Sequence, residues 1–166
     1  MALLTIREIG DPILNKKAKE VKESSDRLQE LIDDMFETMY ETNGVGLAAP
    51  QVGILKRLVV MDVSAEQDQP LVFINPSIVE TSGEQTGYEG CLSVPGKSGL
   101  VTRPNYVKAV ALDRNLQPFE IEGTELLARA ICHECDHLDG VLYRDKAEGG
   151  LFYPEETTDD EDENEE

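Results

Sequence analysis

The residues with the clearest chemical capacity are the two histidines of His133-Glu134-Cys135-Asp136-His137, the only histidines in the chain. On an α-helix, positions i and i+4 lie one turn apart on the same face, so both imidazoles can reach one ion. Glu134 is rotated by about 100° from His133, which places its carboxylate beside the ion, near a bound water. Two ligands and a base suit metal-assisted hydrolysis. The alternative is a pair of histidines that are merely packed or solvated on an amphipathic helix.

A third protein ligand is needed to complete such a site, and the three cysteines, at positions 91, 132 and 135, are the candidates. Cys132 lies about 100° before His133 and Cys135 about 200° beyond it, so neither projects with the histidines. A Cys-x-x-Cys redox or zinc pair is an alternative, although such pairs normally sit at a turn or helix start where both thiolates converge. Burial as small apolar side chains accounts better for both. Cys91, which follows Gly90 in a remote segment, remains a candidate ligand.

A third segment, residues 44–53, contains three glycines separated by small residues. This composition is typical of backbone that packs tightly or that another group approaches closely. It is not a phosphate loop, because it lacks a Gly-Lys-Ser/Thr ending. Gln51 is the one polar side chain in the run, and two interpretations stay open. Its amide is either bonded to backbone in a buried turn or is a fixed donor in a site wall.

Two helices and several strands must position these residues. Apolar residues at three- and four-residue spacing predict a long N-terminal helix over residues 26 to about 42. A second helix, from about 124 to 138, carries the His-Glu-x-x-His motif and ends near Gly140. Strands are predicted at 58–63, 71–74 and 106–112, followed by a turn at 113–118 and another short strand. This order predicts an α+β fold with mostly antiparallel sheets packed around a central C-terminal helix.

Size and charge restrict the remaining possibilities. At 166 residues the chain is long enough for one domain with a hydrophobic core, which we place at residues 1–154. Residues 155–166 hold nine acids and no base, so we expect a disordered acidic tail. The rest is still acidic, with 25 acids against 15 bases, which argues against a specific nucleic-acid binder. No membrane span or secretion signal is predicted, and we expect a cytoplasmic protein.

Three motifs in this order and spacing resemble peptide deformylase, over roughly residues 3–147. They read Gly44-Val45-Gly46-Leu47-Ala48-Ala49-Pro50-Gln51, then Glu89-Gly90-Cys91-Leu92-Ser93, then His133-Glu134-Cys135-Asp136-His137-Leu138. The resemblance implies a bacterial-type hydrolase that removes the N-formyl group from the initiator methionine of nascent polypeptides and releases formate. It implies that Cys91, His133 and His137 bind one divalent metal ion per chain. Fe²⁺ is the native ion expected, and Zn²⁺, Ni²⁺ or Co²⁺ can occupy the same ligands.

The resemblance also implies the roles of other residues. Glu134 would take a proton from the attacking water, while the Gln51 amide and the Leu92 backbone N–H would stabilise the oxyanion. The expected substrate-binding residues are Val45, Gly46, Gly90, Leu126, Arg129 and Ala130. The partners expected are N-formyl-methionyl peptides of nascent chains. Ribosome association is compatible with this, although not through a basic tail.

Two other functions share part of this pattern. A metallopeptidase has the same helix motif, but its expected third ligand is a carboxylate or histidine downstream, and Asp145 and Glu148 have no matching context. A structural-zinc interaction domain would use the cysteines, but it leaves Glu134 and Gln51 unexplained. The sequence therefore favours the deformylase.

Overall fold

The computed structural model describes residues 3–143 and the backbone of residues 148–152. The expected acidic tail, residues 155–166, lies outside the described residues. Two α-helices and eight strands are described, with two short 3-10 helices. In chain order they are η1 (Pro12–Asn15), α1 (Asp26–Glu41), β1 (Gly46–Ala48), η2 (Ala49–Val52), β2 (Leu58–Met61), β3 (Leu71–Ser82), β4 (Gln85–Cys91), β5 (Val94–Arg103), β6 (Tyr106–Leu112), β7 (Pro118–Thr124), α2 (Glu125–Leu138) and β8 (Glu148–Phe152).

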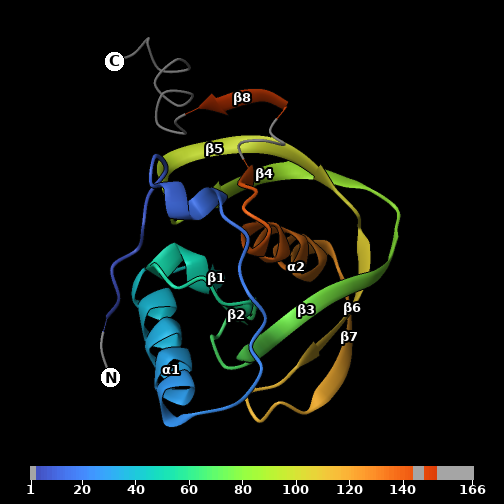
Figure 1. Ribbon diagram of the computed structural model, residues 1–166. Coiled ribbons are helices and arrows are strands. Elements are labelled where there is room, and N and C mark those ends of the chain that lie inside the picture. The colour runs from blue at the N-terminus through green and yellow to red at the C-terminus, as the bar shows by residue number, and fades with distance from the viewer. Residues whose placement is uncertain (1–2, 144–147, 153–166) are drawn as a thin grey trace.

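The strands form two antiparallel sheets around the second helix. One sheet has the order β1-β2-β3-β6-β7 and the other the order β4-β5-β8. Figure 1 shows α2 between these sheets, while α1 lies on the outside beside β1 and β2. The α+β fold with mostly antiparallel sheets around a central C-terminal helix is confirmed.

Helix α1 follows the predicted pattern closely. The Ser25 hydroxyl accepts a hydrogen bond from the N–H of Leu28 and caps the first turn. The chain leaves the helix through Asn43, whose φ of 60° is in the left-handed region that asparagine tolerates. The buried apolar residues of the helix are Leu28, Ile32, Met35 and Met39. They form one core cluster with apolar residues of β1 and β2. The helix thereby fixes the 44–53 segment that follows it.

Helix α2 is largely buried and carries the motif. Its apolar residues Ala128, Ile131 and Leu138 pack into the core against the five-stranded sheet. Gly140 ends it with a φ of 79°, and a Cβ there would lie 2.7 Å from the backbone carbonyl of Asn15. Glycine is therefore required both by conformation and by space. The predicted helix from about 124 to 138 is confirmed, with Thr124 as its N-cap.

The strand predictions were correct in part. The alternation of residues 106–112 is confirmed in β6, where Val107, Ala109 and Ala111 are buried. By contrast, the long hairpin β4–β5 was not predicted, because its glycines, serines and lysine break the apolar alternation. The 44–53 segment contains strand β1 and helix η2 and turns at Gly53, where φ is 88°. Within the described residues, no helix is long and apolar enough to cross a membrane.

Candidate metal centre

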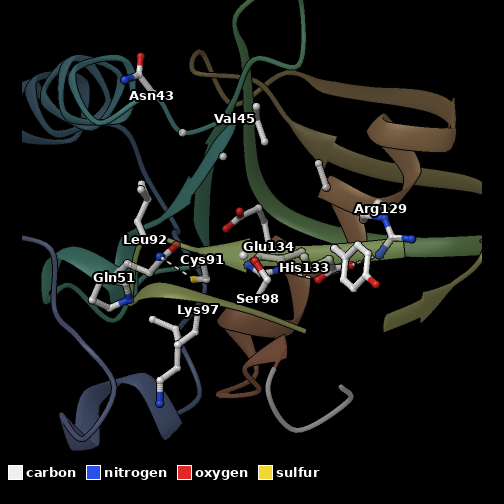
Figure 2. Close-up of a pocket in the computed structure, with 18 of the residues that line it drawn as sticks. Asn43, Val45, Gln51, Cys91, Leu92, Lys97, Ser98, Arg129, His133 and Glu134 are labelled. Carbon is white, nitrogen blue, oxygen red and sulfur yellow. Dashed lines mark hydrogen bonds and ion pairs between the residues drawn. The ribbon is translucent and has the colours of Figure 1, made fainter. Parts of the chain in front are cut away.

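Three potential ligands converge where strand β4 meets helix α2. Cys91 is the last residue of β4, while His133 and His137 lie one turn apart on α2. Their ligand atoms all lie within 4.8 Å of one another, and the Cys91 Sγ is 3.2 Å from the His137 Nε2. Figure 2 shows Cys91 and His133 beside one another at the base of a pocket. The structure therefore brings together a cysteine sulfur and two imidazoles from two distant segments.

This donor set fits one tetrahedral ion. Bonds of about 2.3 Å to sulfur and about 2.0–2.1 Å to nitrogen imply sulfur–nitrogen separations of about 3.6 Å around zinc. The observed 3.2 Å separation of Cys91 and His137 is close to this value. Burial and the charge of His133 lower the pKa of His137 well below its ordinary value, so its imidazole is neutral and available as a ligand. The site thus needs little rearrangement to hold a metal.

The surroundings of His133 also favour a cation. Burial opposes a charged imidazole, yet hydrogen bonds with Cys91 and Glu89 raise the pKa of His133 to about 10. In the absence of metal, a proton on His133 therefore supplies the positive charge that the surrounding acidic groups stabilise. A divalent ion bound to His133 would replace this proton and supply positive charge at the same place.

The other two cysteines do not join this group. Cys132 is buried in the main core, and Cys135 packs against the same core. Burial raises the pKa of the Cys135 thiol to about 12, so this side chain is a neutral thiol. Both belong to the apolar packing of α2, as their angular positions on the helix indicated. Neither cysteine belongs to the group of three or more potential ligands found among the described residues.

Glu134 points into the pocket beside the ligands (Figure 2). Its side chain is buried, and the Oε1 atom has no hydrogen-bond partner among the described residues. Burial raises the pKa of this carboxyl group to about 7, although the charge of His133 opposes the shift. A Cβ on Gly46 would lie 2.6 Å from the Glu134 Oε2, so the glycine makes room for this carboxylate. A carboxyl group with such a pKa can both accept and return a proton near neutral pH.

Gln51 lies on the side of Cys91 opposite Glu134 (Figure 2), and both ends of its side-chain amide form hydrogen bonds. Its Oε1 accepts a hydrogen bond from the N–H of Ala48 at 2.9 Å. Its Nε2 donates to the Ser93 hydroxyl at 3.0 Å and lies 3.5 Å from the Cys91 Sγ. Both interpretations of Gln51 therefore hold in part, because backbone bonding fixes the amide and its donor end faces the metal ligands. Leu92 lines the same pocket.

A buried ion-pair network supports His133 from behind. Its Nδ1 lies 2.9 Å from the Oε1 of Glu89, a carboxylate that Arg103 also binds through two nitrogens at 2.8 and 3.0 Å. Burial alone would raise the pKa of Glu89, but Arg103 and His133 hold it well below its usual range. The ionised carboxylate makes Nδ1 the donor and leaves Nε2 free to bind a metal. Sequence reasoning missed this role of Glu89, although it lies two residues before Cys91 in the same motif.

The ligands open into a pocket of about 640 Å³. All residues expected to bind substrate line it: Val45, Gly46, Gly90, Leu126, Arg129 and Ala130. The unpredicted hairpin β4–β5 supplies further lining residues, namely Tyr88, Pro95, Gly96, Lys97 and Ser98. Tyr88, Leu126 and Val45 are 68%, 49% and 43% exposed, so the mouth of the pocket carries an apolar rim. Such a rim is unusual for free surface and is typical of a binding site.

A mixed thiolate–imidazole metal site with an adjacent buried carboxyl group, at the base of an open pocket, defines a metal-dependent hydrolase. The sequence profile described as polypeptide deformylase matches residues 3–150. The chain belongs to this family, whose members remove the N-formyl group from nascent peptides. Deformylation is the hydrolysis of an amide, which is the kind of reaction that a metal site with an adjacent carboxyl group can carry out.

Individual relatives support the same assignment. The chain is similar to a peptide deformylase of Lachnoclostridium phytofermentans, with 60% identity over 99% of this chain and 100% of that protein. A peptide deformylase of Agathobacter rectalis is 65% identical over 91% of this chain and 94% of its own length. Among solved structures, a peptide deformylase from Legionella pneumophila has a TM-score of 0.86 and 46% identity, covering 89% of this chain and 88% of that one. One from Synechococcus elongatus, in complex with actinonin, has a TM-score of 0.84 and 44% identity, covering 88% and 79%.

Proposed function

We propose that this enzyme deformylates formyl-methionyl peptides with Cys91, His133 and His137 as the ligands of one divalent metal ion and Glu134 as the proton carrier. The observation that carries the proposal is the convergence of these ligand atoms within 4.8 Å of one another beside a buried carboxyl oxygen without a partner among the described residues. An acid–base group needs such an unoccupied oxygen to receive a proton.

The metal supplies Lewis acidity when bound, which makes water a nucleophile at neutral pH and polarises a carbonyl oxygen. The carboxylate of Glu134 accepts a proton from the attacking water and then delivers it to the nitrogen of the leaving amine. One water is consumed, the carbon–nitrogen bond of the formamide breaks, and formate and a free N-terminus are released. The pKa of about 7 suits both halves of this proton transfer.

Gln51 and Leu92 would stabilise the charge that develops on the formyl oxygen. The Gln51 Oε1 is fixed by the N–H of Ala48, so the Nε2 is oriented before substrate arrives. The backbone N–H of Leu92 follows Cys91 directly and belongs to the same pocket wall. A donor fixed in advance stabilises an oxyanion without a reorganisation cost at the moment of reaction.

The substrate peptide would lie extended along Val45, Gly46 and Gly90, in the manner of an added strand. The methionine side chain would enter the pocket between Leu126, Ala130 and the aliphatic part of Arg129. These residues are the ones on α2 that line the pocket N-terminal to the ligands.

We further propose Fe²⁺ as the native metal and the bacterial cytoplasm as the location. Thiolate and imidazole donors suit iron, and Zn²⁺, Ni²⁺ or Co²⁺ can replace it. The nascent chains that serve as substrates and the bacterial relatives named above support the location. Residues 1–154 are proposed to form a single catalytic domain, with the acidic residues 155–166 outside it.

Formate release from formyl-Met-Ala-Ser tests the assignment. The enzyme is prepared anaerobically with Fe²⁺ or Ni²⁺, and wild type is compared with Glu134→Gln at equal metal content. We expect formate from wild type, at least 10²-fold less from Glu134→Gln, and no cleavage of unformylated Met-Ala-Ser. Cleavage of internal peptide bonds, or full activity of Glu134→Gln, would contradict the proposal.

A further inference from the structure

Arg129 lines the substrate pocket, yet its charged end bonds to the protein. The side chain is almost buried, 11% exposed, and its Nη1 donates to the Oε2 of Glu89 at 2.7 Å. The same nitrogen lies 3.2 Å from the carbonyl oxygen of Val101, and the Nη2 lies 3.4 Å from the Oε1 of Gln85. The guanidinium group of Arg129 therefore belongs to the ion-pair network around Glu89, the carboxylate that binds His133.

Glu89 is the junction of that network. Its Oε1 accepts from His133 Nδ1 and Arg103, and its Oε2 accepts from Arg103 and Arg129. Each oxygen therefore has two partners, and three side chains fix the plane of the carboxylate. Because a carboxylate with two occupied oxygens has little freedom to rotate, the imidazole bonded to it is fixed as well.

Arg129 brings a second positive charge to Glu89, because Arg103 is shared with another carboxylate. Arg103 also binds Asp136 at 2.7 Å, so its single positive charge serves two carboxylates. With Arg129 the network contains two guanidinium groups for the carboxylates of Glu89, which is buried, and Asp136, which is partly exposed. Without Arg129, Glu89 would lose its shortest hydrogen bond and one of the two guanidinium groups that hold its carboxylate in place.

We propose that Arg129 is a positioning residue of the metal centre: it anchors Glu89, and through Glu89 it orients His133 toward the ion. The proposal rests on the assignment of His133 as a metal ligand given above. It also explains how a guanidinium group is accommodated in the wall of an apolar pocket, since its charge is directed to Glu89. Partners of this kind typically change metal affinity by about 10- to 100-fold.

The test measures metal affinity in Arg129→Met, which keeps an unbranched aliphatic side chain and removes the guanidinium group. Co²⁺ is titrated into metal-free enzyme against a competing chelator, and the visible Co²⁺ spectrum reports the coordination geometry. We expect Arg129→Met to bind Co²⁺ about 10- to 100-fold more weakly, with an altered spectrum. Arg129→Lys keeps one charged donor and should recover part of the affinity.

Arg114→Met is the matched control. Arg114 also forms an ion pair, with Asp33 at 2.8 Å, and a hydrogen bond with Gln29 on α1, but it does not contact the network around Glu89. This variant should bind Co²⁺ as wild type does. Urea unfolding of all metal-free variants separates a general loss of stability from a loss confined to the metal site.

Two results would overturn the inference. Arg129→Met with wild-type Co²⁺ affinity and spectrum would show that Arg103 alone positions Glu89. An equal loss of affinity in Arg114→Met would show a general effect of lost ion pairs. Neither result touches the proposed function, which fails separately if wild type binds no Co²⁺ or if Cys91→Ala binds it normally.

Discussion

Substitution of Gly46 by alanine tests how closely activity depends on the position of the Glu134 carboxylate. The new Cβ would lie 2.6 Å from Oε2, 3.0 Å from Cδ and 3.1 Å from Cγ of Glu134, whereas ordinary contact begins at 3.4 Å. Gly46 lies in strand β1 and is not among the glycines with positive φ, so alanine fits its backbone. The strain must then be relieved by the side chain of Glu134, whose oxygen has to move by about 0.8 Å.

The expected consequence is a loss of turnover with a folded, metal-loaded enzyme. A misplacement of about 1 Å at a reacting group can cost about 10²-fold, so kcat for formyl-Met-Ala-Ser should fall roughly 10- to 100-fold. Overpacking costs about 1–3 kcal/mol and the loss of glycine flexibility returns about 0.5–1 kcal/mol. The unfolding free energy should therefore fall by about 2.5 kcal/mol or less. Metal content should equal that of wild type.

The comparison variant is Gly90→Ala, in the facing strand of the same pocket. A Cβ there would lie 3.5 Å from the carbonyl oxygen of Lys97, which is an ordinary contact. We expect a smaller loss of kcat than in Gly46→Ala, since Glu134 is not displaced. A kcat for Gly46→Ala within threefold of wild type would contradict the reasoning, because it would mean that Glu134 acts equally well from a shifted position.

Three further predictions concern the metal ligands, the oxyanion donor and the acid–base group. Cys91→Ala should lose most of its bound metal by elemental analysis, whereas Cys132→Ala and Cys135→Ala should retain it, since neither thiol joins the ligand cluster. Gln51→Ala should keep its metal and lose about 10²–10³ in kcat, as for other single oxyanion donors; an unchanged kcat would remove Gln51 from the reaction. In metal-free enzyme, the folded-state pKa of Glu134 is raised from 4.5 to about 7, so protonation favours the folded state and the unfolding free energy declines as pH rises between these values. Glu134→Gln should lose this part of the decline, which is best measured well below pH 6.5, the ordinary pKa of an imidazole, so that His133 stays protonated in both states; identical pH profiles would count against the raised pKa.

The helices and the placing of the two histidines on one helix face were predictable because they follow from local periodicity. The i, i+4 spacing of the histidines is a property of one helix, and the angular positions of Cys132 and Cys135 on that helix separated them from the site. Cys91 required more, because a contact between residues 91 and 137 depends on how β4 is placed against α2. Resemblance to a family supplied that information, which the residues alone left open.

What could not be predicted depends on pairing between distant segments. Strands β4 and β5 contain few apolar alternations and are stabilised by pairing with each other, from Gln85–Arg103 to Cys91–Val94. The role of Glu89 follows from this pairing, since Arg103 reaches it from the facing strand and Arg129 from the helix. A buried carboxylate with three partners has no signature in the linear sequence.

The position of Cys91 at the end of strand β4 has a further consequence once a metal is bound. The three-stranded sheet contributes one ligand and the helix packed on the five-stranded sheet contributes two, so the ion is a cross-link between two layers of the fold. An ion bound at about 1,000 times its dissociation constant adds about 4 kcal/mol to the folded state. Loss of the ion would therefore loosen the whole domain while it stops catalysis, and proteases would meet the inactive enzyme in a less stable form.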